Sequence, residues 1–135
     1  LSLMIALDRQ YLAKYGADAD SLLKVYPVSG QTNTHYTIKK ERGLPMDIPL
    51  VDGLAPLNVA RKGGAPIDLI TGSRDLELLA RYEENAHLEV ILRHLGHPVR
   101  LFEMEGFDHG SVLAPACLFI AGDIRRLDSG KSQGR

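Results

Sequence analysis

The second half of the chain constrains the fold most, because two short apolar segments alternate there with two longer amphipathic ones. Residues 66–71 and 99–104 are typical of buried strands. Residues 76–95 and 112–127 carry apolar side chains at helical spacing. Strands that alternate with helices of this length pair in parallel through right-handed crossovers. The sequence therefore predicts an α/β fold, a three-layer sandwich built on a parallel sheet.

The first half adds a helix, a strand and a long irregular segment to this prediction. Residues 1–15 place apolar side chains on one helical stripe, and Gly16 is typical of the position just after a helix end. Residues 22–28 form a short apolar run that predicts a third strand. Residues 31–65 hold three prolines and no lasting period, which is typical of a lid or substrate-facing loop and equally of a solvent-facing connector.

Charge and composition exclude several classes of protein. Lys and Arg number 16 against 17 Asp and Glu, so the net charge is −1 and a nucleic-acid partner is not expected. A hydrophobic share of 44% argues against disorder, and the one cysteine, Cys117, excludes a disulfide framework. No apolar run approaches the ~18–20 residues of a membrane span. No signal peptide is visible, so the default expectation is a cytoplasmic location, although a start before Leu1 stays open.

Two glycine-rich loops follow the last two predicted strands and carry the candidate catalytic residues. Asp75 lies in the loop 71–75, and His109 lies in the loop 106–110. Parallel neighbours bring both loops to one sheet edge, where a carboxylate can bond imidazole Nδ1 as in a Ser–His–Asp triad. Each residue also has a simpler interpretation, because Asp75 suits the N-cap of a helix starting at Leu76 and a loop histidine often serves as a structural hydrogen-bonding group.

Five short motifs follow one another along the chain. They are Ser29-Gly30-Gln31-Thr32, Asp52-Gly53-Leu54-Ala55-Pro56-Leu57, Leu69-Ile70-Thr71-Gly72, Arg81-Tyr82-Glu83-Glu84-Asn85 and Gly106-Phe107-Asp108-His109-Gly110. In their type and order they resemble those of α/β-hydrolase carboxylesterases, in the bacterial branch related to acetyl esterases and hormone-sensitive-lipase-like enzymes. The likeness runs from about Leu1 to Leu127.

The resemblance implies a serine carboxylesterase or lipase that acts on a small ester substrate. It makes Asp75 the triad acid and His109 the triad base, with Glu77 as a fallback acid because the acidic position in this loop can shift. Residues 31–65 become part of the substrate-facing cap. No cofactor and no metal is implied, since triad esterases need neither.

The chain departs from this family at the nucleophile. In these enzymes the helix that matches residues 1–15 directly follows the G-x-S-x-G elbow, and Leu1 already lies inside an apolar pattern. Residues 1–127 are therefore expected to be the C-terminal part of an α/β-hydrolase domain, followed by a polar tail over residues 128–135. The serine and the oxyanion hole would belong to an absent N-terminal half, so the chain alone is expected to be inactive.

The alternative is a non-catalytic, truncated hydrolase-like module that acts in oligomerisation or interaction. In that case the apolar first helix and an open sheet edge would be buried against a second copy, giving a homo-oligomer.

The other candidate nucleophiles fit the chemistry poorly. The literal motif Gly130-Lys131-Ser132-Gln133-Gly134 sits in the polar tail, without the strand that an elbow requires before it. Ser29 ends a predicted strand and is the best remaining serine, but serines there are usually turn formers. Ser111 follows His109 too closely to meet its imidazole.

Neither the cysteine nor the remaining histidines of the second half predict a further site. Cys117 is expected to be buried and inert on the last helix. His94 and His97 flank a helix C-terminus, where they suit the helix dipole better than a zinc ion, for which no third ligand is found.

Overall fold

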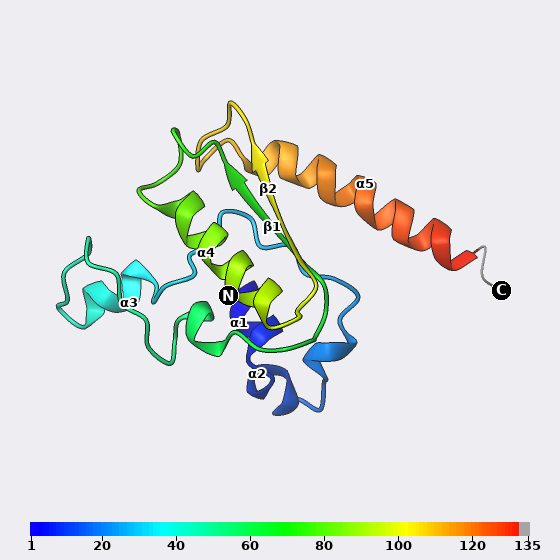
Figure 1. Ribbon diagram of the computed structural model, residues 1–135, viewed down its shortest axis with the longest axis horizontal. Helices are drawn as coiled ribbons and strands as arrows, with labels where there is room; N and C mark the ends of the chain where they lie inside the picture. Colours follow the sequence, from blue (N-terminus) through cyan, green and yellow to red (C-terminus); the bar gives the residue numbers. More distant parts are fainter. Residues whose placement is uncertain (133–135) are drawn as a thin grey trace.

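The computed structural model describes residues 1–132 and shows a mixed α/β chain with a small parallel sheet (Figure 1). Strands β1 (Ile67–Gly72) and β2 (Val99–Met104) pair in parallel, with α4 (Arg81–His94) as the crossover between them. The predicted parallel pairing of these two strands is confirmed. The other elements are α1 (Ser2–Leu7), α2 (Gln10–Ala13), α3 (Tyr36–Glu41), α5 (Leu113–Ser132) and the 3-10 turns η1 (Ala19–Ser21) and η2 (Pro56–Val59).

Residues 22–28 do not form the predicted third strand and make only isolated parallel bridges to β1. Val25 and Ser29 donate backbone N–H bonds to carbonyls in and just before β1, at 2.9 and 2.6 Å. Pro27 lies between them and has no N–H to donate, so the rung that would join the two bridges is missing. The segment therefore lies beside β1 with the register of a strand and without a continuous ladder.

The predicted helix over residues 1–15 is broken in two. Asp8 has an extended backbone (φ −98°, ψ 103°) and ends α1, and its Oδ1 accepts the N–H of Gln10 at 3.0 Å. An aspartate side chain competes in this way with the helical backbone bonds. Gly16 has a φ of +73° after α2, so the predicted left-handed stop is confirmed.

The helix expected over residues 76–95 begins only at Arg81. Ala80 precedes it with a left-handed φ of +59°, and residues 73–80 form turns. Asp75 is therefore not the N-cap of this helix. The predicted stop at Gly96 is confirmed, since this glycine has a φ of +76° directly after α4.

The excursion over residues 31–65 is largely irregular, as predicted, and holds only α3 and η2. Its first part is closed into a loop at Asp52, because Thr34 Oγ1 donates to this carboxylate at 2.7 Å and Arg42 pairs with it at 2.6 Å. The excursion forms the part of the molecule that carries α3 in Figure 1.

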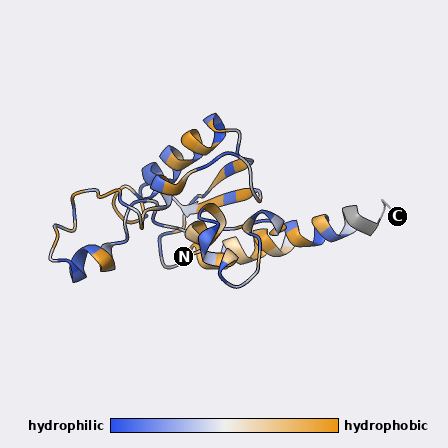
Figure 2. Cartoon of the chain, turned by 90° about the horizontal axis from the view of Figure 1, so that it is seen from below, coloured by the Kyte–Doolittle hydropathy of each residue, from blue (hydrophilic) through white to orange (hydrophobic). Residues whose placement is uncertain are grey.

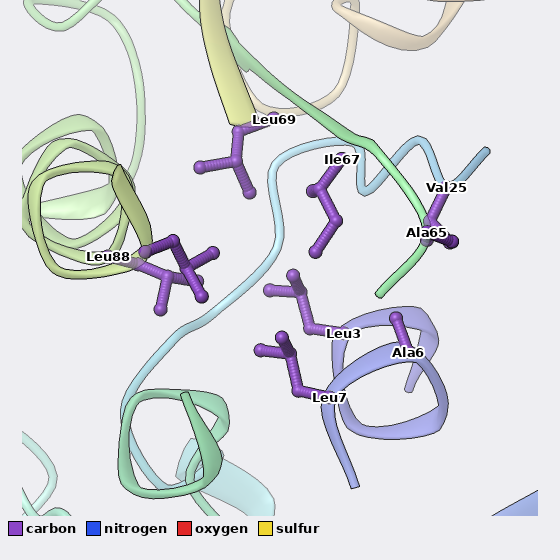
Figure 3. Close-up of a cluster of buried hydrophobic side chains, with 9 residues drawn as sticks. Leu3, Ala6, Leu7, Val25, Ala65, Ile67, Leu69 and Leu88 are labelled. Atoms are coloured by element: carbon purple, nitrogen blue, oxygen red, sulfur yellow. The ribbon is translucent and has the colours of Figure 1, made fainter. Parts of the chain in front are cut away.

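Two apolar clusters pack against β1, one on each side of the strand. Ile67 and Leu69 point to one side and Ile70 to the other, as alternation along a strand requires. The larger cluster joins β1 to α1 and α4, and Figure 3 shows Leu3 and Leu7 facing Leu69 and Leu88. The smaller cluster joins Ile70 to the start of α5, through Val112 and Ala116.

Helix α5 packs on the strands at its start and then extends away from the rest of the chain (Figure 1). It continues past Leu127 to Ser132, so the predicted polar tail is helical up to that residue, and residues 133–135 lie outside the described part. Apolar and polar residues alternate along the projecting part (Figure 2). Cys117 is exposed on this helix, so the prediction that it is buried is wrong. Among residues 1–132, no helix has the length and apolar character to cross a membrane.

Candidate functional site

The loops that follow β1 and β2 are bonded directly to each other. Ser73 donates its N–H to the carbonyl of Phe107 at 2.8 Å, and Gly106 donates its N–H to Ser73 Oγ at 2.6 Å. Gly72 permits this approach, because a Cβ there would lie 2.4 Å from the carbonyl oxygen of Phe107. The carboxyl ends of the two strands thus hold both candidate loops at one edge of the sheet, as the sequence predicts.

Glu77 is the acid that this edge brings to the histidine. Its Oε2 lies 3.0 Å from Nδ1 of His109, with the glutamate side chain fully buried and the histidine side chain 45% exposed. Asp75 lies two residues earlier in an exposed turn and does not bond His109. The contact with His109 is therefore made by Glu77, the fallback acid of the sequence prediction, and not by Asp75. Helix α4 begins only at Arg81, which leaves Glu77 in the turn before the helix.

Four groups hold the Glu77 carboxylate in place. The N–H groups of Gly72 and Leu78 donate to it at 3.0 and 3.1 Å, and the Ser29 hydroxyl and His109 Nδ1 complete the set. Burial by itself raises the pKa of Glu77, but these hydrogen bonds outweigh burial and hold the pKa below its ordinary value. The side chain is thus a buried, ionised acceptor.

Ser29, the best of the remaining candidate serines although serines there are usually turn formers, lies in this site. It is buried with a left-handed φ of +48°, and its Oγ lies 2.9 Å from Nδ1 of His109 while it also bonds Glu77. The available signal was its position at the end of the 22–28 run. Ser29 Oγ and Glu77 Oε2 thus both lie within hydrogen-bond distance of the same ring nitrogen, Nδ1 of His109. Among the described side chains, none bonds the other ring nitrogen, Nε2.

A cavity of about 820 Å³ opens in front of these residues. Ser29 and His109 line it together with parts of α1, the segment before Gly30, the excursion and the start of α4. Its apolar walls include Leu3, Met4, Val28, Ile38 and Leu54. The half-exposed imidazole of His109 therefore lies beside a space large enough for a small organic molecule.

The remaining candidates lie outside this arrangement. Ser111 donates both its N–H and its Oγ to Asp108, at 2.8 and 2.7 Å, and does not bond His109. His97 is buried, with its ring nitrogens 3.3 and 3.0 Å from two backbone carbonyls, and His94 is exposed. Within residues 1–132, no group of three or more His, Cys, Asp or Glu side chains is placed to hold a metal ion.

The arrangement is chemically that of an oriented general base. A carboxylate that accepts from Nδ1 fixes the neutral tautomer in which Nε2 carries the lone pair. Such an Nε2 can take a proton from a hydroxyl group in the cavity and return it later.

Comparison of the chain with protein-family models, curated proteins and solved structures finds no match.

Proposed function

We propose that this chain supplies the acid and the histidine of a serine carboxylic-ester hydrolase, with Glu77 as the acid and His109 as the base. The observation that carries the proposal is the 3.0 Å contact between the buried Glu77 carboxylate and Nδ1 of the half-exposed His109. The order of the two residues, each following its own parallel strand, also supports it. The motif resemblance to esterases of the hormone-sensitive-lipase-like branch points to a small ester substrate.

In this mechanism His109 Nε2 removes the proton of an attacking serine hydroxyl and then delivers it to the leaving alcohol. Glu77 keeps the proton of the neutral ring on Nδ1 and stabilises the imidazolium that forms after proton transfer. Ser29 supports Glu77 by donating its hydroxyl hydrogen to the carboxylate. Ser29 is thus a positioning residue, since its Oγ lies on the Nδ1 side of the ring.

The attacking serine and the oxyanion hole would come from a polypeptide segment outside these 135 residues. The backbone of residues 24–28 supports this part of the proposal, because Val25 and Pro27 bond β1 while the outward-facing groups of Tyr26 and Val28 have no backbone partner among the described residues. A parallel strand added there would bring its carboxyl end near Ser29 and His109. The complete fold would then be a three-layer α/β-hydrolase sandwich, with residues 31–65 in its cap.

A second candidate function is that of an interaction module that forms homo-oligomers. It is favoured by the exposed apolar side chains of α5, where Leu113 and Leu118 are 59% and 78% exposed. Light scattering of the purified chain separates the candidates, since a monomer contradicts the module and leaves the hydrolase proposal intact.

The hydrolase proposal is tested with 4-nitrophenyl acetate and a fluorophosphonate probe. The 135-residue chain alone should show background hydrolysis and no labelled serine, whereas labelling of Ser29 would contradict an external nucleophile. Joined to the nucleophile-bearing segment, the chain should be active, and Glu77→Gln should lower kcat by about 10⁴-fold. Asp75→Asn is the matched control and should retain activity, because Asp75 does not bond His109.

A further inference from the structure

Arg81 is a buried guanidinium at the wall of the cavity beside His109. It is the first residue of α4, it is 7% exposed, and it lines the same 820 Å³ space as Ser29 and His109. A guanidinium has five N–H donors, and one bond of Arg81 is formed, from Nη1 to the carbonyl of Ser29 at 2.8 Å. Nε is buried without a partner.

No carboxylate in the described part of the chain forms an ion pair with Arg81. Glu84 lies one helical turn further along α4, but its oxygens accept from Thr32 N and Asn33 Nδ2 at 3.2 and 3.1 Å. Glu77 is occupied by its own four donors. Asp47 lines a smaller cavity of about 140 Å³ that Arg81 also borders, and it pairs with no cation there.

Such a charge is unusual inside a protein, because buried arginines are normally paired with an acid. The walls of the large cavity do not supply one, since no Asp or Glu is among the residues that line it. The walls are instead mostly apolar, with neutral polar groups such as Gln31 and Asn33, and the other basic groups that line them are His35, His109 and the amino group of Leu1. The cavity thus combines a hydrocarbon-compatible surface with one unpaired guanidinium.

We infer that this cavity binds an anionic ligand whose carboxylate pairs with Arg81 and whose hydrocarbon part fills the apolar walls. Nη2 has neither a hydrogen-bond partner nor complete burial, so its N–H groups are free to donate to a ligand oxygen. The planar guanidinium matches a carboxylate better than a point charge does. Resting on the proposed function, the inference makes the substrate an ester that carries a free carboxylate in its acyl or alcohol part.

The test is a calorimetric titration of the chain with 4-phenylbutyrate and with its neutral match, 4-phenylbutyramide. The acid should bind at least about tenfold more tightly than the amide. Arg81→Met removes the charge while keeping much of the volume, and it should abolish the preference, so that the acid binds no more tightly than the amide. Arg93→Met is the matched control, because Arg93 lies on the same helix and pairs with Glu89 at the surface.

Equal binding of acid and amide to the wild-type chain, or a preference that survives in Arg81→Met, would overturn the inference. If Arg81→Met fails to fold, the wild-type Nε–Hε NMR signal of Arg81 decides, since the acid should shift it and the amide should not. Binding requires no catalysis, so the two proposals can fail separately. A carboxylate preference in the chain, with no esterase activity after the chain is joined to the nucleophile-bearing segment, would contradict the proposed function and not this inference.

Discussion

Oε2 of Glu77 lies 3.0 Å from Nδ1 of His109, although 32 residues separate the two in the chain. The contact joins the loops after two neighbouring parallel strands, and its members differ sharply in exposure. The Glu77 side chain is completely buried, while 45% of the His109 side chain is exposed. The acid side chain is thus shielded from water and held ionised by donors, and the base lines the cavity with no side chain of the described residues bonded to its Nε2.

Ser29→Ala should weaken the hold on the Glu77 carboxylate. The variant loses the hydroxyl that donates to the carboxylate, and this hydrogen bond is one of those that lower the pKa of Glu77. Because burial raises the same pKa, the pKa should rise from its lowered value in the variant. The free energy of unfolding should fall by about 1 kcal/mol. A ¹³C NMR titration of the glutamate carboxyl measures the pKa. Ser111→Ala, which loses two hydroxyl hydrogen bonds, both with Asp108, is the control, and an unchanged Glu77 pKa in Ser29→Ala would contradict the assigned role.

Gly72→Ala should separate the two loops of the site. Its Cβ would lie 2.4 Å from the carbonyl oxygen of Phe107, so the backbone of one loop must move. Urea unfolding should show a loss of about 1–3 kcal/mol. Gly53→Ala has no atom within 4 Å of the added Cβ and should stay within about 0.5 kcal/mol of wild type. A wild-type stability for Gly72→Ala would show that the close approach does not matter.

Asp123→Asn should loosen α5 from the segment 22–28 that lies beside β1. Lys24 Nζ lies 2.6 Å from the Asp123 carboxylate, and Tyr26 donates to the same group at 2.8 Å, with the charged pair nearly buried. Loss of one partner leaves Lys24 with only Asp68, and the free energy of unfolding should fall by about 3 kcal/mol. Asp128→Asn on the exposed face of α5 is the control and should have little effect.

The same carboxylate predicts a loss of stability in acid. The Lys24 ammonium and the Tyr26 hydroxyl hold the pKa of Asp123 below its ordinary value. Its contribution is therefore complete above the unfolded pKa of about 4 and is lost as the pH falls towards the lowered folded value. Thermal unfolding across this range should show a smaller acid-induced decrease in Asp123→Asn than in wild type, and parallel decreases would contradict the assignment.

The sequence pattern was sufficient for the parallel strands and their helical crossover, because apolar spacing and the Gly96 stop act locally. It was insufficient where a single residue determines whether a strand is continuous or where a helix begins or ends. Pro27 removes a rung between two bridges, and Asp8 ends a helix whose apolar stripe continues past it. Ala80 adopts a left-handed backbone that no composition rule anticipates, and this delays α4 until Arg81.

The candidate site divides in the same way. The position of His109 follows from strand order, because parallel neighbours bring their carboxyl ends together. The choice between Asp75 and Glu77 does not follow, since it depends on how the turn before α4 is folded. The roles of Ser29 and Arg81 depend on contacts between residues about fifty positions apart, Ser29 with Glu77 and Arg81 with Ser29, and no local pattern predicts them.

The central claim, that Glu77 and not Asp75 orients His109, is tested most directly by the tautomer of His109 in ¹⁵N NMR at a pH where the ring is neutral. A carboxylate only accepts, so the wild-type ring should carry its proton on Nδ1. Glu77→Gln can also donate and should increase the form with the proton on Nε2, while Asp75→Asn should match wild type. A tautomer shift in Asp75→Asn with none in Glu77→Gln would contradict the account.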